Sequence, residues 1–484
     1  MKPLYHNDKT AQIDLLAARA LGIDSFALMQ KAGEAIYQHV KQHHHILVIT
    51  GPGNNGGDGF VVAELARKNH RKVKVWALKS KAELTGDARK AADLYQGEVM
   101  GGNLATVLDE PYDCIVDSIF GTGLSQVVTG DYAAAIHWVN QQPSTVLAVD
   151  IPSGLNGSTG KIEGCAVKAD KTISILATNT GLFTLDGQDC CGEVVHESLG
   201  LSSSNFNSVN HDGWLLEQQV LNEVHHKRIN NSHKGHFGHV LTAGGQAGMM
   251  GAVLLAGKAV LKSGAGLTTV VTDQAHADSL PLHAPELMSV SFDGLNEQRM
   301  YQSLLDKQAD IILLGMGLGQ SQWSKDLYKC CLQLDLPMVM DADALTLLAQ
   351  AAVVPGQLKV ITPHPKEAAN LLGISTEAVQ QNRWLAVKKL ATQYRCIAVL
   401  KGSGTLISDG HETWCCPFGN ANLATAGSGD VLAGMLAGLI AQGFDAVKAS
   451  QLAVVWHALA GENNPFGLTM TASDLLNTLH FTVK

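Results

Sequence analysis

The stretch Ile46-Leu47-Val48-Ile49-Thr50-Gly51-Pro52-Gly53-Asn54-Asn55-Gly56-Gly57-Asp58-Gly59 decides how the first half of the chain folds. Its first five residues form a short apolar run, which is typical of a buried strand in a parallel sheet. A helical pattern over residues 60–68 follows the polar, glycine-rich run. A strand, a glycine-rich turn and a helix N-terminus together form a cradle for an anion or a ribose, because glycine lets free backbone amides approach a ligand. The run is neither GxGxxG nor a P-loop, so it predicts a nucleotide-like ligand without identifying it.

Short β-branched runs alternate with helical patterns on both sides of this stretch. In the first half we predict strands over residues 46–50, 73–78, 114–118 and 145–150, preceded by a long helical region over about residues 11–41. In the second half we predict strands over residues 239–242, 267–272, 311–314, 338–341, 359–361 and 396–400, and a closing helix pair over about residues 430–462. Such alternation is the pattern of α/β proteins, in which helices cover parallel sheets.

The length of 484 residues exceeds what one hydrophobic core usually organises, so we expect two domains. The clearest candidate linker is the segment 202–208, whose composition is polar, small and aperiodic. The two halves show no obvious repeat of each other. We therefore predict an α/β protein with a doubly wound domain over residues 1–213 and a different α/β domain over residues 221–484.

Composition and charge exclude several classes of protein. The formal net charge of −9 disfavours a general affinity for nucleic acid, because phosphate neutralisation needs a basic surface. No apolar stretch approaches the ~20 residues of a membrane span, and the polar N-terminus lacks the apolar core of a signal peptide. Nine cysteines without CxxC spacing indicate reduced thiols. We expect a soluble, cytoplasmic enzyme that binds neither membranes nor nucleic acid.

Two further predicted strands of the first half end in loops that begin with aspartate. Asp117 opens the run Asp-Ser-Ile-Phe-Gly-Thr-Gly, and Asp150 opens the run Asp-Ile-Pro-Ser-Gly. Ligands of open parallel sheets bind outside the carboxyl ends of the strands, so these loops should converge with the glycine-rich run on one crevice. A single aspartate at a strand end is often only a helix cap, whereas three such loops favour a binding site. Oxygen-rich side chains without Cys or His favour a hard cation, if a metal binds.

The strongest motif of the second half is Thr425-Ala426-Gly427-Ser428-Gly429-Asp430, at the start of the predicted helix pair. Its glycines would expose successive amides at a helix N-terminus, where they stabilise a developing phosphate charge. Asp430 would lie within reach of a substrate hydroxyl and suits the base of a phosphoryl transfer. The alternative is a glycine-rich helix cap with Asp430 as the N-cap residue.

Other loops of the second half carry candidate binding residues. The run Lys401-Gly402-Ser403-Gly404-Thr405 offers a cation and free amides for phosphates, and Gly315-Met316-Gly317-Leu318-Gly319 is a further glycine loop after a strand. His364 lies between two prolines and could either orient a substrate or be a surface histidine. Asp341 and Asp343 suit either a magnesium-bound phosphate or a helix cap.

The motifs of the first half closely resemble the NAD(P)H-hydrate epimerase domain over about residues 1–213. They are Asn54-Asn55-Gly56-Gly57-Asp58-Gly59, the Asp-x-x-x-Gly-Thr-Gly run from Asp117, Val149-Asp150-Ile151-Pro152-Ser153-Gly154, and Leu28-Met29-Gln30-Lys31-Ala32-Gly33, in which Gln30 stands where a glutamate is usual. The resemblance implies a Rossmann-like fold, with Asp150 as the acid/base residue that helps interconvert two epimers. It implies a potassium ion held by Asn55, Asp117 and Ser153. It also implies that the hydrated nucleotide contacts Asn54, Asn55, Gly56, Gly57, Asp58, Gly121, Thr122, Gly123, Leu124, Ser125, Gln126, Val127 and Asp150.

The motifs of the second half resemble the ADP-dependent NAD(P)H-hydrate dehydratase, a ribokinase-like enzyme, over about residues 221–484. They are Gly244-Gly245 with Gly251-Ala252, Lys262-Ser263-Gly264-Ala265-Gly266-Leu267, Asp341-Ala342-Asp343-Ala344-Leu345, Thr362-Pro363-His364-Pro365, Lys401-Gly402 and the loop that ends at Asp430. Lys366 and Ser428 depart from the family pattern, where a glycine and a threonine are usual. The resemblance implies that the hydrate contacts Ala252, Gly317, His364 and the catalytic Asp430. It implies that the adenine nucleotide, bound with magnesium, contacts Lys401, Gly402, Ser403, Gly404, Thr405 and Gly429.

We therefore predict a bifunctional repair enzyme for hydrated NADH and NADPH (NADHX and NADPHX). The first domain would interconvert the R and S hydrates, and the second would use ADP to dehydrate the S hydrate. The expected partners are these small molecules and further copies of the same chain. One alternative is a ribokinase-type kinase for a vitamin or a sugar, with a regulatory N-terminal domain. A second alternative is an N-terminal domain that binds its ligand without catalysis.

Overall fold

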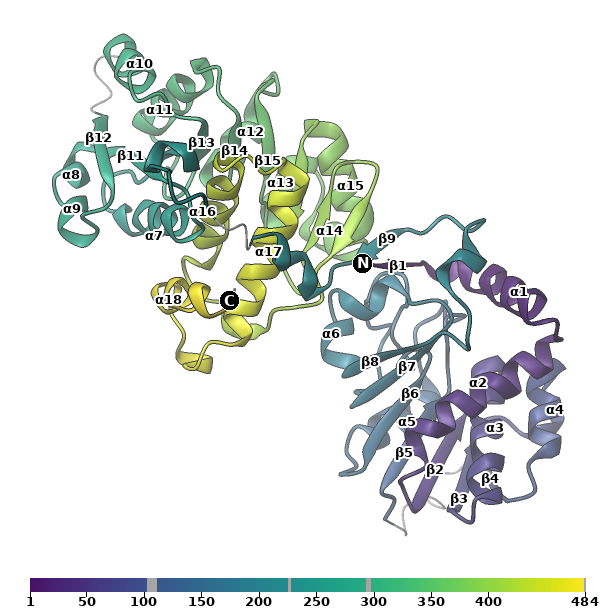
Figure 1. The fold of residues 1–484 in the computed structure, drawn as a ribbon. Helices are drawn as coiled ribbons and strands as arrows, with labels where there is room; N and C mark the ends of the chain where they lie inside the picture. The colour runs from purple at the N-terminus through teal and green to yellow at the C-terminus, as the bar shows by residue number, and fades with distance from the viewer. Residues whose placement is uncertain (102–110, 225–227, 293–296, 483–484) are drawn as a thin grey trace. The chain divides into compact units, whose positions relative to one another are not determined.

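The computed structural model describes residues 1–101, 111–224, 228–292 and 297–482 (Figure 1). The chain divides into two compact units, Lys2–Trp214 and Leu215–Lys484 together with Met1. The segment 202–208, which we predicted to be a linker, lies inside the first unit. It forms a short 3-10 helix over Ser203–Phe206, and the ring of Phe206 is buried against α1 (Thr10–Leu21). The apolar ring of Phe206 and the flanking Leu199 and Val209 pack into the same buried cluster, which holds this otherwise polar segment against the unit.

The first unit is built on a seven-stranded sheet in the order β4-β3-β2-β5-β6-β7-β8. All neighbouring strands are parallel, which confirms the predicted doubly wound sheet. The direction of winding reverses between β2 and β5, and this is where a crevice forms in such sheets. The strands are β2 (His45–Thr50), β3 (Lys72–Ala77), β4 (Glu98–Gly101), β5 (Cys114–Ser118), β6 (Thr145–Val149), β7 (Lys171–Ile175) and β8 (Glu193–Glu197). Two short strands, β1 (Lys2–Leu4) and β9 (Gly213–Leu215), pair near the two ends of the unit.

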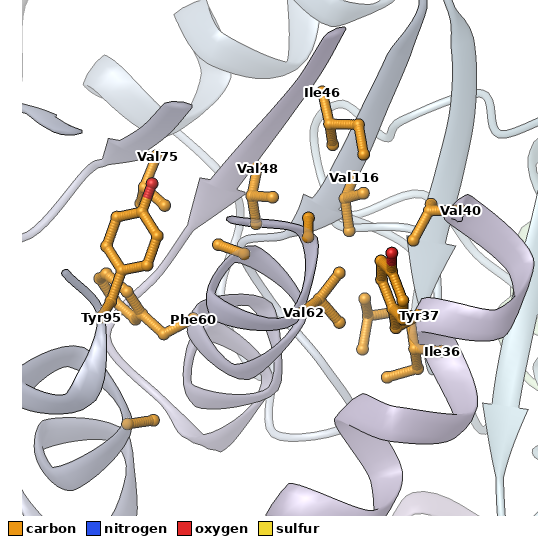
Figure 2. Close-up of a cluster of buried hydrophobic side chains, with 14 of the residues drawn as sticks. Ile36, Tyr37, Val40, Ile46, Val48, Phe60, Val62, Val75, Tyr95 and Val116 are labelled. Carbon is orange, nitrogen blue, oxygen red and sulfur yellow. The ribbon is translucent and has the colours of Figure 1, made fainter. Parts of the chain in front are cut away.

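Helices cover both faces of this sheet. Side chains of α2 (Ser25–Val40), α3 (Asn54–Lys68) and α4 (Gly86–Leu94) form a buried cluster with β2, β3 and β5, in which Phe60 of α3 and Tyr95 lie side by side (Figure 2). On the opposite face, α5 (Gly130–Val139) packs against the sheet in a second cluster. A short α6 (Gly187–Cys190) precedes β8.

The helical region that we predicted as continuous over residues 11–41 consists of two helices. Gly22 ends α1 in the left-handed conformation, with φ +67°. Asp24 then caps α2, because its carboxylate accepts a hydrogen bond from the amide of Ala27 at 2.8 Å. Because the helix is broken here, α1 is not a continuation of α2, and residues of α1 reach the ligand cavity of the first unit.

Among its described residues, the second unit contains a row of nine hydrogen-bonded strands in the order β18-β17-β16-β15-β14-β13-β10-β11-β12. Neighbours from β12 to β16 are parallel, and β17 and β18 are antiparallel additions. The strands are β10 (His239–Ala243), β11 (Leu267–Asp273), β12 (Met288–Phe292), β13 (Ile311–Leu314), β14 (Met338–Met340), β15 (Leu358–Ile361), β16 (Ile397–Leu400), β17 (Leu406–Ser408) and β18 (Thr413–Cys415).

The helices of the second unit lie on both sides of its sheet (Figure 1). The helices α7, α16 and α17 pack on one side, and α11 and α15 pack on the other. The helices are α7 (Met250–Lys262), α8 (Gln274–Ala277), α9 (Leu280–His283), α10 (Glu297–Leu305), α11 (Gln322–Gln333), α12 (Asp343–Gln350), α13 (Pro365–Leu372), α14 (Thr376–Gln381), α15 (Arg383–Tyr394), α16 (Ser428–Ala441), α17 (Ala446–Glu462) and α18 (Ala472–Thr482).

The apolar helix α16 is a core helix of the second unit. A Cβ atom at Gly434 would lie 2.3 Å from the carbonyl oxygen of Ala256, and one at Gly438 would lie 2.2 Å from the hydroxyl of Ser263. Both glycines therefore allow close packing of α16 against α7. Within the described ranges, no helix combines the length and the apolar character that crossing a membrane requires.

Candidate active sites of the two units

In the first unit, a cavity of about 890 Å³ opens at the carboxyl ends of the strands. The loops after β2, β5 and β6 contribute to its wall, as predicted, and so do α1 and α2. Most of the predicted substrate-binding residues line this cavity: Asn54, Asn55, Asp58, Gly121, Thr122, Gly123, Leu124, Ser125, Gln126, Val127 and Asp150. The structure thus brings residues from three separate loops to one space large enough for a small-molecule ligand.

The run that we predicted as a glycine-rich loop is the first part of a helix, because α3 begins at Asn54. Gly56 and Gly57 are buried in that helix and do not line the cavity. A Cβ atom at Gly56 would lie 2.2 Å from the carbonyl oxygen of Gly51, and one at Gly57 would lie 2.7 Å from the sulfur of Met29. These glycines therefore let α3 approach the end of β2 and the helix α2.

Asp117 and Ser153 form a buried pair beneath the cavity wall. The Ser153 hydroxyl donates to one Asp117 oxygen at 2.5 Å, and the Ser153 amide donates to the other at 2.8 Å. Burial raises the pKa of Asp117 to about 6, although the Ser153 hydrogen bonds oppose the rise. Asn55 lines the cavity with 9% of its surface exposed, and its Nδ2 finds no hydrogen-bond acceptor among the described residues. The described residues contain no cluster of three or more His, Cys, Asp or Glu that could hold a metal ion.

Asp150 lies directly after β6 in a conformation that is rare for a residue with a side chain. Its φ is +65°, in the left-handed region, and such strain is typical of functional positions. The amide of Ile175 donates to its carboxylate at 3.3 Å. Burial, followed by the neighbouring Asp14 carboxylate, raises the pKa of Asp150 to about 7. Asp150 therefore gains or loses a proton near neutral pH.

Asp14 and Asp58 complete a group of three carboxyl groups in this cavity. Burial raises the pKa of Asp14 to about 6. Burial, and then the charges of Asp150 and Asp14, raise the pKa of Asp58 well above its usual range. Asp14 was not among the residues predicted from the sequence. No local motif marks this residue, because it reaches the cavity only through the packing of α1.

In the second unit, the loops after β14, β15 and β16 meet the N-terminus of α16. Gly427 precedes α16 in the left-handed conformation, with φ +89°, and Asp430 lies in the first turn. A Cβ atom at Gly429 would lie 3.4 Å from Lys401 Nζ and 3.9 Å from Asp341 Oδ2. The predicted Gly-Ser-Gly-Asp motif therefore lies beside the predicted Lys401 and Asp341, and its free amides face the same region.

Lys401 is the cationic centre of this site. Its ammonium lies 2.7 Å from Asp341 Oδ1 and 4.0 Å from Glu367 Oε2, and the Thr362 hydroxyl donates to Asp341 at 2.8 Å. Burial alone would lower the pKa of Lys401, but the Asp341 and Glu367 carboxylates outweigh it and raise the pKa. Lys401 therefore stays protonated and can attract a phosphate.

Asp430 and Glu367 both have pKa values near neutral pH. Burial and the Asp341 charge raise the pKa of Asp430 to about 7, and Lys401 opposes this rise. Burial raises the pKa of Glu367 to about 7 as well, again against the effect of Lys401. A carboxylate with a pKa near the working pH suits a general base. Glu367 was not predicted as a site residue, although it follows the Thr362–Pro365 motif by two positions.

His364 caps the helix α13. Its Nδ1 accepts from the amides of Lys366 and Glu367 at 3.1 and 3.2 Å, and Glu367 returns a hydrogen bond by accepting from the His364 amide at 2.8 Å. The His364 side chain remains 47% exposed, and its Nε2 lies 3.3 Å from Glu367 Oε1. Among the other predicted residues, Gly317 has φ +58°, and a Cβ atom there would lie 3.1 Å from that of Ala252. These two residues therefore lie together.

Arg383, which was not predicted from the sequence, binds the backbone of the predicted nucleotide loop and of the end of β16. It is 1% exposed, and its guanidinium donates to the carbonyl oxygens of Leu400, Lys401 and Gly404 at 3.3–3.4 Å. A Cβ atom at Gly402, where φ is +133°, would lie 2.7 Å from this guanidinium. Burial lowers the pKa of Arg383 to about 10, so it remains charged at neutral pH. Its role depends on a contact between α15 and the loop after β16, which no local motif indicates.

The two units define a two-domain α/β enzyme, and each unit carries a candidate active site of its own. Residues 240–480 match the family described as NAD(P)H-hydrate dehydratase, and residues 25–181 match the family described as YjeF-related protein N-terminus. The chain belongs to the family of bifunctional NAD(P)H-hydrate repair enzymes. It is 39% identical to the bifunctional NAD(P)H-hydrate repair enzyme Nnr of Coxiella burnetii, over 96% of this chain and 95% of that protein. It is 36% identical to the enzyme of the same name from Escherichia coli, over 98% of this chain and 93% of that protein.

Solved structures support the predicted ribokinase-like fold of the second half. The ADP/ATP-dependent NAD(P)H-hydrate dehydratase from Bacillus subtilis, co-crystallised with ATP and Mg²⁺, aligns with a TM-score of 0.51 and 27% identity. The alignment covers 56% of this chain and 97% of that one. A ribokinase-like superfamily protein from Enterococcus faecalis aligns with a TM-score of 0.51 and 29% identity, over 57% of this chain and 96% of that one. The predicted ribokinase-like fold is therefore confirmed.

Proposed function

We propose that this chain repairs hydrated NADH and NADPH in two steps. The first unit interconverts the R and S hydrates, and the second uses ADP to return the S hydrate to NAD(P)H, with AMP and phosphate as the other products. The observation that carries this proposal is the placement of Asp430 at the N-terminus of α16, beside the Lys401–Asp341 ion pair. Family membership supports the same two activities.

In the second unit, Asp430 takes the proton of the ring hydroxyl. The hydroxyl oxygen attacks the β-phosphorus of ADP, and the bond to AMP breaks. The amides at the start of α16 stabilise the charge that develops on the transferred group. Phosphate, a better leaving group than hydroxide, then departs, and a proton is lost from the neighbouring ring carbon. Ala252, Gly317 and His364 would hold the hydrate, and Lys401, Gly402, Ser403, Gly404, Thr405 and Gly429 would hold the nucleotide.

The carboxylates of the second unit fit a divalent cation that accompanies ADP. Asp341, Asp343 and Glu367 all raise the pKa of Asp430 through their negative charges, and a cation would relieve this repulsion. Magnesium bound with ADP would offset the negative charge of the transferred phosphoryl group.

In the first unit, Asp150 serves as the acid/base residue, and the hydrate fills the cavity. Asn55, Asp117 and Ser153 fit a potassium ion, because all three supply oxygen atoms and the buried Asp117 carboxylate favours a cation. Bound potassium would offset that buried charge. The nine cysteines are all free, which supports a reducing compartment such as the cytoplasm. A homo-oligomer stays a prediction.

The proposed function is tested by adding ADP and magnesium to a mixture of the two NADH hydrates. We expect the absorbance of the dihydronicotinamide ring to return in full. Chromatography should show both hydrates disappearing while AMP and phosphate accumulate. A chain that leaves both hydrates intact and phosphorylates a vitamin alcohol or a sugar would instead be a ribokinase-type kinase.

The rate of dehydration should fall as the pH falls below about 7. Asp430 must be ionised to accept a proton, and its pKa of about 7 means that acidification removes the active form. Below that pH, kcat/KM should decrease by about tenfold for each pH unit, and above about pH 8 it should level off. Initial rates with the purified S hydrate measure this profile. A rate that stays constant down to about pH 5 would contradict the role of Asp430 as base.

Replacing Arg383 with lysine should weaken ADP binding more than it slows catalysis. Lysine keeps the charge but lacks the planar fork that holds three carbonyl oxygens of the nucleotide loop. We expect the KM for ADP to rise by about tenfold, in line with the loss of one or two hydrogen bonds, and kcat to change by about twofold at most. Steady-state kinetics test this, with the exposed Arg395→Lys as the matched control. An unchanged KM would show that the loop holds its shape without Arg383.

A further inference from the structure

Three carboxyl groups from three different elements share the cavity of the first unit. Asp14 comes from α1, Asp58 from α3, and Asp150 from the loop after β6. Among the described residues that line the cavity, none is a lysine, an arginine or a histidine. Two other titratable groups line it. Asp87 is paired with Lys90 at 2.8 Å, and Tyr132 is a neutral phenol whose pKa burial raises further. No cation therefore balances Asp14, Asp58 and Asp150 from the described wall.

The amide of Asn55 indicates that this cavity receives a polar ligand. Asn55 is 9% exposed, lines the same cavity as the three carboxyl groups, and has a buried Nδ2 without an acceptor among the described residues. A buried amide without a partner is costly, so an acceptor on a bound molecule is the expected partner. Asp150 is held in place by the amide of Ile175 and by its left-handed backbone. Asp150 is therefore held in place at the wall of this cavity.

Burial and the neighbouring negative charges give these carboxyl groups different pKa values. Burial, and then the charge of Asp14, raise the pKa of Asp150 to about 7, whereas the pKa of Asp14 is raised to about 6. Burial, and then the charges of Asp150 and Asp14, raise the pKa of Asp58 as well. At neutral pH, Asp14 is therefore mostly ionised while Asp150 exchanges a proton. Pairs of acids separated in this way are typical of sites that carry out both acid and base steps.

We propose that Asp14 is a positioning residue of the epimerase site, whose negative charge lets Asp150 both take and return a proton during each turnover. The proposal rests on the epimerase function proposed above. In the step we envisage, Asp150 takes the proton of the ring hydroxyl, a carbon–oxygen double bond forms, and the bond from that carbon to the ring nitrogen breaks. The electron pair moves to the nitrogen and into the conjugated carboxamide. Nitrogen attack on the opposite face, with return of the proton from Asp150, gives the other epimer.

The test is the pH profile of epimer exchange in the full chain with Asp14→Asn. Removing the like charge allows Asp150 to ionise more readily, so the acidic limb of the profile should move to lower pH by about one unit. Chromatography of the two hydrates measures the exchange in the absence of ADP. Asp131→Asn, which removes an exposed carboxylate from the same unit, should leave the profile unchanged. Asp14→Glu retains the charge and should restore the wild-type profile, which a merely structural role would not require.

Two results separate this inference from the proposed function. If Asp14→Asn keeps the wild-type profile while Asp150→Asn abolishes exchange, Asp14 has no influence on Asp150 and the inference is wrong, although the epimerase function stands. If the wild-type chain exchanges no epimers, the proposed function itself fails. Should Asp14→Asn not fold, Asp14→Glu and Asp14→Ser are compared instead. Equal profiles for these two would overturn the inference, since only glutamate carries the charge.

Discussion

Asp430→Asn should lower the rate of ADP-dependent dehydration by about 10³-fold, because a positioned general base contributes roughly 10²- to 10⁴-fold. Asparagine has nearly the shape of aspartate but cannot accept the proton of the ring hydroxyl. The start of α16 should remain intact, because Gly427 and not Asp430 is its N-cap residue. The KM for ADP should change little or fall, since one of four nearby negative charges is removed. Initial rates with the S hydrate measure both parameters.

Two controls make this prediction specific to the second unit. Asp306→Asn removes an exposed carboxylate from the same unit and should leave the rate unchanged. Epimer exchange by the Asp430→Asn chain should equal that of the wild type, because the first unit carries its own acid/base group. Dehydration at more than about a tenth of the wild-type rate would contradict the role of Asp430 as base.

Residues of the candidate sites were predictable where their chemistry is contained in one short run of sequence. The Gly427–Asp430 motif is an example, because a glycine-rich turn, a helix start and a carboxylate follow one another directly. Asp14 and Arg383 were not predictable, since each reaches its site through the packing of a helix against a distant loop. The glycines after β2 were identified from the sequence, but only a ligand-binding role was predicted for them. Gly56 and Gly57 allow close packing of α3, a requirement that only the tertiary structure reveals.

The fold was predictable to a similar extent, and for a similar reason. Buried parallel strands such as β2 and β6 are largely continuous apolar runs, so their positions were predicted closely. The strands β1, β4, β7, β8, β9, β12, β17 and β18 were missed. Of these, β4, β8 and β12 are only partly buried and lack a clear apolar pattern. The strands β1, β9, β17 and β18 have three residues each, and the sequence of β7 alternates polar with apolar residues although its centre is buried. The break at Gly22 was also missed, although a glycine followed by an aspartate N-cap is a recognisable helix boundary.

Asp150→Asn should lower the rate of epimer exchange by about 10²- to 10⁴-fold. Asparagine is the suitable replacement because it tolerates the left-handed φ of +65° at this position, whereas alanine would add backbone strain. With ADP and a mixture of both hydrates, the wild-type chain should recover all of the dihydronicotinamide absorbance. The Asp150→Asn chain should recover only the share that corresponds to the S hydrate and then stop, with the R hydrate remaining on the chromatogram.

The amplitude of that recovery distinguishes a catalytic first unit from one that only binds. If the first unit merely binds the hydrate, Asp150→Asn should still convert the whole mixture at the wild-type rate. If the substitution impairs the second unit instead, the S hydrate present at the start should itself be converted more slowly. A normal first phase followed by a missing second phase is expected only when Asp150 takes part in exchange. The neighbouring exposed Asp131→Asn should show both phases, since it removes a carboxylate that does not line the cavity.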